Sequence, residues 1–515
     1  MRYAPPARKP ARTVLIGVTV LGWALAPVAG AQAPGRTQVV AVTGGSPPEG
    51  DGTFREFNNP ALNDAGQVAF HAKLTGRNDY GVYRTNGNGL VRVARLGYSP
   101  APGLTPYSSL GLSVVDYRGS FIAPFGISGV NEAGQVPFWG SRAGEAGPVA
   151  GTFLGDGNKT TRVSPTSEPL AVNNLGQVLF MSHDERRFHY TDIRRADASK
   201  QVFIARDPGA RYQHPELNHR GQVAYGTNNY GYNGSRTIYD GIYLGDGSTA
   251  SRVDRRGQTL PGGNRFYGDT SYLFDLNDSG QVAFTAMVWD GENAPTIATA
   301  VLLADGSMLE TLAQSGGPAP GGDGRLVSIG DVTTVNSAGQ VLLHATVAGT
   351  HGGRSDGSGL YRIDGDTTTA IARVGQQAPG GGSFATLDTT NSTVSNMYSS
   401  VMNEEGQVAF SASVGGNRGL FLYDDALGLL QIARVGDRFL GSTIRALSST
   451  GWDEPTPSEV SFNERGQLAY NFFLADGRSG VAVWSVPEPT AAAASLGLGS
   501  AWLLRRRRRD VDADC

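Results

Sequence analysis

The chain has 515 residues, of which 72 are glycine and only 17% are charged, and its formal net charge is −3. Abundant glycine with sparse charge favours many short strands joined by tight turns over a helical protein. The charge balance argues against a nucleic-acid partner, and the single cysteine, Cys515, excludes an intrachain disulfide and a cysteine-based metal site.

The first 31 residues have the pattern of a signal peptide. A basic leader that includes Arg2, Arg8 and Arg12 precedes an apolar run from Val14 to Val28. Small residues follow, and cleavage after Ala31 is favoured because the other option would leave a proline next to the cut. We therefore expect the protein to be exported.

One short motif recurs along the sequence: Asn, two variable residues, Gly, Gln, an aliphatic residue, then usually a small residue and an aromatic one. Self-similarity at intervals of about 40 to 70 residues predicts a repeat fold. The eight asparagines that open the motif are Asn63, Asn131, Asn173, Asn218, Asn277, Asn336, Asn403 and Asn463.

The motif is interpreted as the turn between the first two strands of each repeat. The amide oxygen of Asn can accept a backbone N–H within such a turn, and Gly supplies a left-handed residue. The Gln is expected to bond a backbone group between strands or blades. A calcium site is not favoured, because the two intervening residues do not keep a constant charge. No metal ligand, catalytic residue or cofactor is predicted.

Two further strands complete each repeat. The third reads like Gly359-Leu360-Tyr361 and often ends in an Asp-Gly turn, and the fourth reads like Ile371-Ala372-Arg373. Four antiparallel strands per unit predict an all-β protein, a β-propeller of about eight blades over residues 37–486. Seven blades and an open β-solenoid are the alternatives.

The ends of the repeat array complement each other. The last unit stops at its third strand, while an unpaired strand near Val39 precedes the first unit. We expect this N-terminal strand to complete the last blade and to close the ring, which would hide the exposed sheet edges of an open array.

Residues 487–515 have the composition of a short membrane tail. An apolar stretch at residues 490–504 precedes an arginine cluster at residues 505–509, and fifteen residues at 1.5 Å each are short for a bilayer core of roughly 30 Å. The cluster would hold its end on the cytoplasmic side. The residues that mark the two ends of this segment are Val486, Pro487, Glu488, Pro489, Arg505, Arg506 and Arg507.

The tail resembles the PEP-CTERM sorting signal of Gram-negative bacteria, and the repeats resemble a tandem-repeat family named for the Asn-x-x-Gly-x-x-Ala-Phe motif. The first resemblance implies an exosortase as partner, transient insertion of the tail in the inner membrane, and delivery to the cell surface or extracellular matrix. The second implies export and anchoring, and no reaction.

A ligand is expected on the face that carries the loops between second and third strands, because these loops differ most between repeats. Aromatic side chains can cover the apolar face of a sugar ring while polar ones bond its hydroxyls. The interpretation that these residues only populate solvated turns is favoured over a ligand site. The candidate ligand-binding residues are Tyr230, Tyr232, Arg236, Trp289, Asp290, His351 and Arg354.

The sequence thus favours an exported, non-catalytic propeller that binds extracellular polysaccharide or an envelope partner. The first alternative is an extracellular carbohydrate-active hydrolase or lyase with its site on the loop face. A purely structural envelope protein is the second alternative.

Overall fold

The structure is a computed structural model, and the residues that it describes begin at Gly35 and end at Val486, with gaps. The described ranges are 35–58, 60–76, 79–101, 104–110, 114–115, 121–122, 129–144, 149–165, 169–184, 189–206, 210–229, 238–254, 260, 265–289, 298–319, 324–349, 357–387, 400–448 and 461–486. One compact unit comprises Gly35–Glu488. The described residues form strands and no helix, so no helix among them is a candidate to cross a bilayer.

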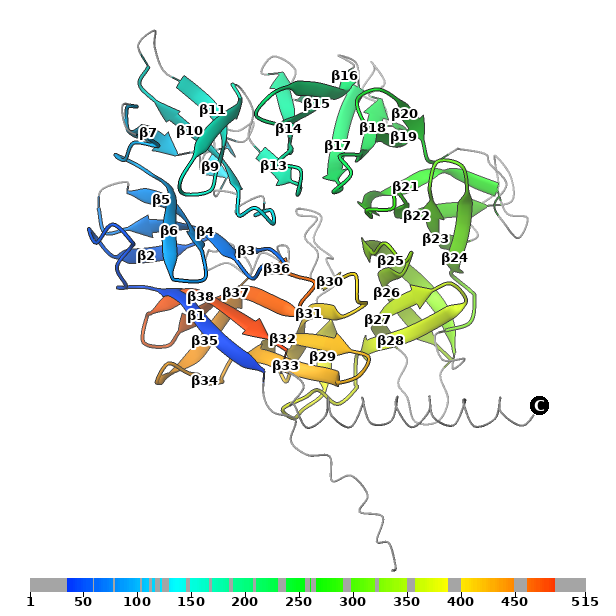
Figure 1. Cartoon of the computed structure of the whole chain (residues 1–515). Helices are drawn as coiled ribbons and strands as arrows, with labels where there is room; N and C mark the ends of the chain where they lie inside the picture. The colour runs from blue at the N-terminus through cyan, green and yellow to red at the C-terminus, as the bar shows by residue number, and fades with distance from the viewer. Residues whose placement is uncertain are drawn as a thin grey trace, which may run out of the picture. The chain divides into compact units, whose positions relative to one another are not determined.

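Eight antiparallel sheets are arranged in a ring (Figure 1), which confirms the predicted eight-bladed propeller. In blades 1 to 4, the strands run in sequence order from the first strand to the fourth. These blades consist of β2 (Phe54–Phe57), β4 (Val68–Leu74), β5 (Tyr80–Thr85) and β6 (Leu90–Arg95); β7 (Tyr107–Leu110), β10 (Val136–Arg142), β11 (Val149–Gly155) and β12 (Thr160–Ser164); β13 (Pro169–Val172), β14 (Val178–Asp184), β15 (His189–Ala196) and β16 (Gln201–Arg206); β17 (Ala210–Leu217), β18 (Val223–Asn229), β19 (Ile238–Gly245) and β20 (Ala250–Arg252).

Blades 5 to 7 repeat this order, and blade 8 takes its outer strand from the N-terminus. They consist of β21 (Arg265–Leu276), β22 (Val282–Trp289), β23 (Ala298–Ala304) and β24 (Leu309–Gln314); β25 (Arg325–Val335), β26 (Val341–Ala348), β27 (Gly357–Asp364) and β28 (Thr367–Arg373); β29 (Phe384–Leu387), β31 (Val408–Val414), β32 (Asn417–Asp424) and β33 (Gly428–Arg434); β35 (Ser442–Ser448), β37 (Gln467–Leu474), β38 (Ser479–Ser485) and β1 (Arg36–Val42).

The first strand of a blade is the innermost one, and it is irregular. First strands of neighbouring blades contact each other, as β17 does with β21 and β21 with β25. In blades 1, 7 and 8 the first strand is interrupted, and short strands then pair with the second strand: β3 (Ala61–Leu62), β30 (Ser400–Met402) and β36 (Ser461–Phe462). The remaining strands are β34 (Arg438–Phe439), which pairs with β35, and the pair β8 (Val114–Val115) and β9 (Phe121–Ile122).

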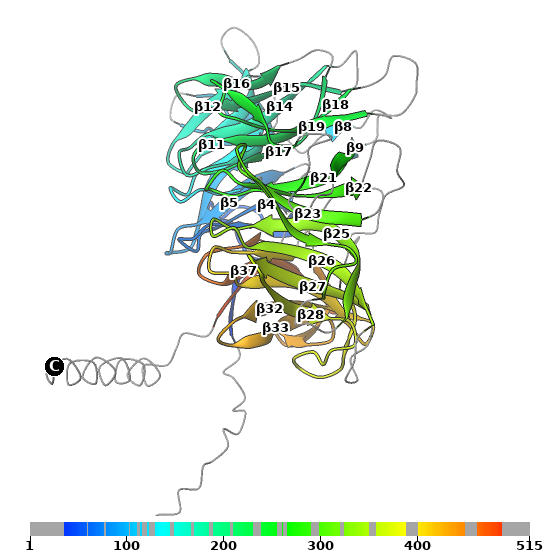
Figure 2. The same ribbon diagram turned by 90° about the vertical axis from the view of Figure 1, so that its right-hand side faces the viewer.

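Strand alternation explains the apolar part of the motif. In β22, Val282 and Phe284 are buried in a core cluster with Ile242 of blade 4, while Ala283 packs in the next cluster with Leu343 of blade 6. Seen edge-on in Figure 2, the sheets of blades 5 and 6 lie one above the other. Each motif strand therefore joins two blades, and each buried Phe contributes about 2 kcal/mol.

The third-strand pattern Gly-x-aromatic also has a packing cause. A Cβ added to Gly81 would lie 2.6 Å from the ring of Tyr83, and one added to Gly419 would lie 2.8 Å from the ring of Phe421. The aromatic ring folds back over the glycine two positions before it. In blade 1 this ring packs edge-on against Phe54, at 5.2 Å between centroids.

The ring is closed by strands from both ends of the sequence, as predicted. β1 pairs antiparallel with β38, so that Arg36 lies opposite Ser485 and Val42 opposite Gly480. Just beyond β1, Thr43 Oγ1 lies 2.9 Å from Ser479 Oγ. Blade 8 thus has its first three strands from the C-terminal end and its fourth from the N-terminal end.

Candidate functional site

The repeated Asn forms a tight turn with the Gln four residues later. In the turn at Asn63, the Asn Oδ1 accepts the Gln67 N–H at 2.8 Å, and the Asn Nδ2 donates to Gln67 Oε1 at 2.9 Å. The Gln side chain therefore bonds the Asn of its own turn, and the expected Gln bond to a backbone group is wrong. The Asn and the Gln are four residues apart in one turn, so the Gln Oε1 meets the Asn Nδ2 as its nearest donor.

The same Asn side chains link all eight blades in a closed circle. Each Nδ2 also donates to the backbone carbonyl oxygen of the motif Asn in the next blade, and Asn463 of blade 8 donates to Asn63 of blade 1 at 2.8 Å. Seven links are 2.8 to 3.2 Å long, and the link from Asn336 to Asn403 is longest at 3.4 Å. All eight asparagines are buried. The eight residues predicted to form the turns are thus also the blade-to-blade connectors.

A second circle of bonds runs beside the first, through the residue that follows each Asn. Its N–H donates to the side chain of the equivalent residue in the next blade: Asp64 to Glu132 at 2.7 Å, Asn174 to His219 Nδ1 at 3.3 Å, and Glu464 to Asp64 at 2.8 Å. Seven of these links are present between described residues. The residue at this position changes in charge, but its side chain offers a hydrogen-bond acceptor in each of these links.

The second circle contains carboxylates that lie close together where the ring closes. The Glu464 carboxylate accepts the Glu404 N–H at 2.7 Å. Desolvation raises the pKa of Glu464 to about 7, the Glu404 N–H opposes the rise, and the charges of Asp64, Glu404 and Glu405 add to it. Among the described residues, no group of three or more His, Cys, Asp or Glu side chains has the geometry of a metal site.

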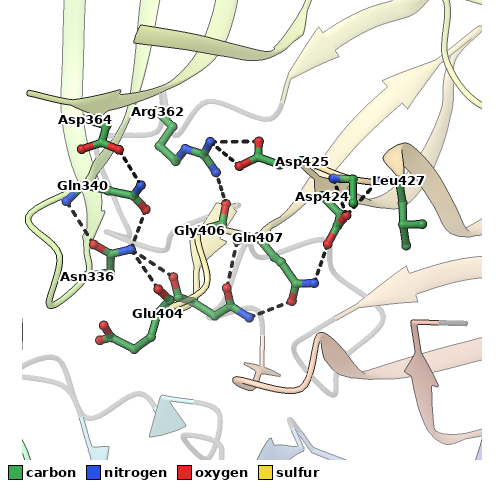
Figure 3. A network of polar contacts seen from close by, with 12 residues as sticks. Asn336, Gln340, Arg362, Asp364, Glu404, Gly406, Gln407, Asp424, Asp425 and Leu427 are labelled. Atoms are coloured by element: carbon green, nitrogen blue, oxygen red, sulfur yellow. Dashed lines mark hydrogen bonds and ion pairs between the residues drawn. The ribbon is translucent and has the colours of Figure 1, made fainter. Parts of the chain in front are cut away.

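Buried arginines on the third strands form further blade contacts (Figure 3). Arg362 of β27 donates through Nη2 to both oxygens of Asp425 in blade 7 at 2.9 Å, and its Nη1 bonds the backbone carbonyl oxygen of the motif Gly406. Arg84 bonds the carbonyl oxygen of Asp156 in blade 2 in the same way, at 2.7 Å. These contacts lie on the side of the motif turns and use charge for blade assembly.

The residues predicted to bind a ligand fall mostly outside the described residues. Trp289 is described: it is the last residue of β22, and its register partner is Arg265 of β21. The other predicted ligand residues lie outside the described ranges, and so does the predicted sorting signal except for Val486. These residues are Tyr230, Tyr232, Arg236, Asp290, His351 and Arg354, and Pro487, Glu488, Pro489, Arg505, Arg506 and Arg507.

A cluster of charged and aromatic side chains that the sequence did not predict surrounds Arg95, at the end of β6. The guanidinium is buried and lies 2.6 Å from a carboxylate oxygen of both Asp51 and Asp79. Burial alone would lower the pKa of Arg95, but the hydrogen bond and charge of Asp79 raise it overall. The Tyr98 hydroxyl donates to Asp51 at 2.7 Å, which raises the pKa of Tyr98 and lowers that of Asp51.

A cleft opens beside this cluster, between blades 1 and 2. It is small, with room for about one water molecule, and it runs from the β6–β7 loop to the β11–β12 hairpin. Its walls include Arg92, Tyr98, Tyr107 and Thr160. Two features of the sequence could have indicated this cluster and its cleft. They are the Ala-Arg pair that ends the fourth strand and the two carboxylates in the loop after β1.

The protein belongs to a family of unknown function, DUF7453, whose model matches residues 28–152 and 149–493. No curated protein matches it.

Solved structures that match include three enzymes, all at low identity. An oligogalacturonate lyase in complex with manganese is 12% identical, with 85% of this chain and 98% of the lyase covered and a TM-score of 0.39. An α-L-arabinanase of Penicillium chrysogenum complexed with arabinobiose is 13% identical, with 88% and 98% covered and a TM-score of 0.23. A puromycin-hydrolyzing peptidase of Mycobacterium tuberculosis is 13% identical, with 84% and 51% covered and a TM-score of 0.35, so the present protein spans about half of its length. At these values the likenesses carry no inference about activity.

Proposed function

We propose that this member of the DUF7453 family is an exported, surface- or matrix-directed propeller that binds extracellular polysaccharide or an envelope partner without transforming it. The export step rests on the leader at residues 1–31, and the sorting step on the tail at residues 487–515. An exosortase would process the tail, which would enter the inner membrane transiently in a Gram-negative cell.

The observation that carries the proposal is the place where the backbone enters and leaves the propeller. Arg36 and Gln467 both lie opposite Ser485, at the two edges of β38. Val486 packs against the motif turn, since a Cβ on Gly466 would lie 2.5 Å from its Cγ2. The leader and the tail are therefore joined to the same end of blade 8, the end of the motif turns.

This arrangement supports a display function. If the tail holds the protein at the cell surface, its point of attachment is the motif-turn end of blade 8. The two circles of hydrogen bonds hold the blades together at this end. The loops between second and third strands follow the opposite ends of the motif strands, and because their sequences differ between repeats we assign the partner to them.

The binding step is tested on the exported protein purified from its host. We expect it to be retained on the host's own exopolysaccharide in affinity electrophoresis, with the length of the polymer unchanged. Absence of binding to any host polysaccharide would contradict the polysaccharide proposal and leave only an envelope partner. New reducing ends or unsaturated sugar products would instead favour the hydrolase or lyase.

The sorting step is tested separately in the host. Replacement of Pro487 and Glu488 by alanine should leave export intact and should retain the protein with its tail in the membrane fraction. A matched change at Asp512 and Asp514, beyond the arginine cluster, should leave sorting unchanged. Normal surface delivery of the Pro487/Glu488 variant would contradict the sorting proposal.

A further inference from the structure

Four asparagines of the chain stand in the acceptor sequence for N-linked glycosylation, which is Asn-x-Ser or Asn-x-Thr with x other than proline. They are Asn158, Asn233, Asn277 and Asn391. Asn233 and Asn391 lie outside the described residues. The other two have opposite surroundings, and the structure therefore separates them where the sequence does not.

Asn277 has no room for a sugar in the folded propeller. It is the motif Asn of blade 5 and is 3% exposed. Its Nδ2 donates to Gln281 Oε1 at 2.9 Å and to the carbonyl oxygen of Asn336 at 2.8 Å, so both of its N–H bonds are used. A glycosidic bond at Nδ2 would replace one of these hydrogens and put a sugar inside the circle of blade links. Here the acceptor sequence is part of the architecture.

Asn158 lies at the tip of the hairpin between β11 and β12, and it is exposed. Its carboxamide makes no hydrogen bond with any described residue, while its backbone N–H donates to Asp156 Oδ1 at 2.7 Å. Lys159, the middle residue of the acceptor sequence, is exposed as well. A sugar on Asn158 Nδ2 would therefore reach solvent and break no hydrogen bond of the fold.

The fold does not need an amide at this position. Hairpins of the same kind join the third and fourth strands of blades 4 and 5, where Ser248 and Ser307 take the place of Asn158. In all three turns an Asp side chain accepts the backbone N–H groups two and three residues later, at 2.7 to 2.9 Å. The Asp and the glycine after it therefore make the turn, and the side chain of Asn158 is left for another role.

The residues on either side of Asn158 complete the acceptor sequence. Thr160 provides the hydroxyl that the transferring enzyme requires. Asp156 provides a carboxylate two positions before the Asn, where bacterial enzymes of this class favour an acidic residue. Asn233 and Asn391 lack an acidic residue at that position. Among the four sites, only Asn158 combines this acid with an exposed side chain in the described part of the chain.

We propose that Asn158 is an N-glycosylation site, modified after export by an oligosaccharyltransferase with a polyprenyl diphosphate-linked oligosaccharide as donor. Asn158 Nδ2 forms a bond to the anomeric carbon, and the bond from that carbon to the diphosphate oxygen breaks. The polyprenyl diphosphate leaves with the electron pair, one Nδ2 proton passes to a base of the enzyme, and nothing is oxidised or reduced. Transfer to the chain before it folds leaves the hairpin able to form, because the product stays in solvent. This inference goes beyond the proposed function and rests only on its export step.

The test is peptide mapping by mass spectrometry of the protein purified from its host. We expect the native peptide that contains Asn158 to carry an added mass of whole sugar residues. Asn158→Ser should remove this mass and keep the circular dichroism spectrum, because blades 4 and 5 have Ser at this position. Thr160→Ser should keep the modification, and Thr160→Val should abolish it.

Ser279→Ala is the matched control, since it removes the acceptor sequence at Asn277 and keeps the Asn itself. It should change the mass of the protein only by the substitution. An Asn158 peptide without sugar, in protein recovered outside the cytoplasm, would overturn the glycosylation proposal and leave the proposed function standing. Sugar found only at another of the four sites would overturn it as well. Protein retained in the cytoplasm with its leader intact would overturn the export step and both proposals.

Discussion

At the scale of single residues, the motif Gly has two reasons to be glycine. Gly280 has a φ of 84°, which a residue with a Cβ adopts at a cost, and a Cβ there would lie 2.9 Å from Oε1 of Gln222 in the preceding blade. The Gly and the Gln of successive motifs thus pack on each other. Only the first reason can be read from one repeat.

A pair of Gly→Ala variants separates these two reasons. Gly316 has a φ of 86° and nothing within 4 Å of an added Cβ, so Gly316→Ala should cost only the backbone strain, about 1 kcal/mol. Gly280→Ala should cost more, about 3 kcal/mol, because the Gln222 side chain must also move. Denaturant unfolding of both variants gives the difference; equal costs would show that the contact with Gln222 is unimportant.

Glu464 should make stability depend on pH. Its pKa is raised from 4.5 to about 7 in the folded protein, so the proton is held more tightly in the folded state than in the unfolded one. Its contribution to stability is fully present below pH 4.5 and is lost as pH rises through 7. Glu464→Gln keeps the acceptor for the Glu404 N–H and cannot ionise.

Thermal unfolding of Glu464→Gln across pH checks this expectation. The variant should melt higher than the native protein at about pH 8 and at the same temperature at about pH 4. Because Glu464 is desolvated only in part and keeps much of its surface in solvent, high salt should shrink the difference at the higher pH. A difference that is the same at both pH values would rule out the proton as its cause.

At the scale of strands, one third-strand position joins neighbouring blades by either of two chemistries. In blade 6, Arg362 of β27 lies opposite Leu342 of β26. The equivalent residue in blade 5 is Leu303 of β23, which lies opposite Ala283 of β22. Charged and apolar side chains thus replace each other at a position that faces the next motif turn. The Arg362 side chain is buried but Asp425 is largely exposed, so an apolar residue in place of Arg362 would leave no buried charge without a partner.

Two substitutions of Arg362 test whether packing or charge matters there. Arg362→Leu should cost less than about 1 kcal/mol, since the Leu seen in the neighbouring blade fits the position. Arg362→Ala should cost about 3 kcal/mol, because it removes the same contacts and leaves a cavity. The free energies of unfolding measured in denaturant decide this, and a Leu variant as unstable as the Ala variant would show that the charge contacts dominate.

At the scale of the whole molecule, stability depends on closure of the ring. β1 covers the outer edge of β38, and Asn463 joins blade 8 to blade 1. A variant that starts at Gly44 lacks β1 and exposes the edge of β38. We expect it to melt well below a variant that starts at Gly35 and to associate through this edge. Equal melting temperatures and monomeric behaviour of both in size-exclusion chromatography would contradict closure by β1.

Much of the fold was predictable from the sequence because each motif is a local event. Asn, Gly and Gln lie within five residues, so the turn at Asn63 forms from neighbours, and the following Val and Phe reveal strand alternation. The position of β1 was predictable because the last repeat lacks a fourth strand, while one extra strand precedes the first repeat. These inferences need no knowledge of how blades pack.

The tertiary structure alone decided what the polar residues do. Asn63 bonds Asn131, 68 positions away, and the residue after each Asn matters as an acceptor for another blade; in the sequence that position looks variable. The cleft at Tyr107 is likewise formed by two blades and a loop. Local hydrogen bonding and alternation can be read along a sequence, whereas these contacts exist only after the ring has closed and brought distant residues within bonding distance.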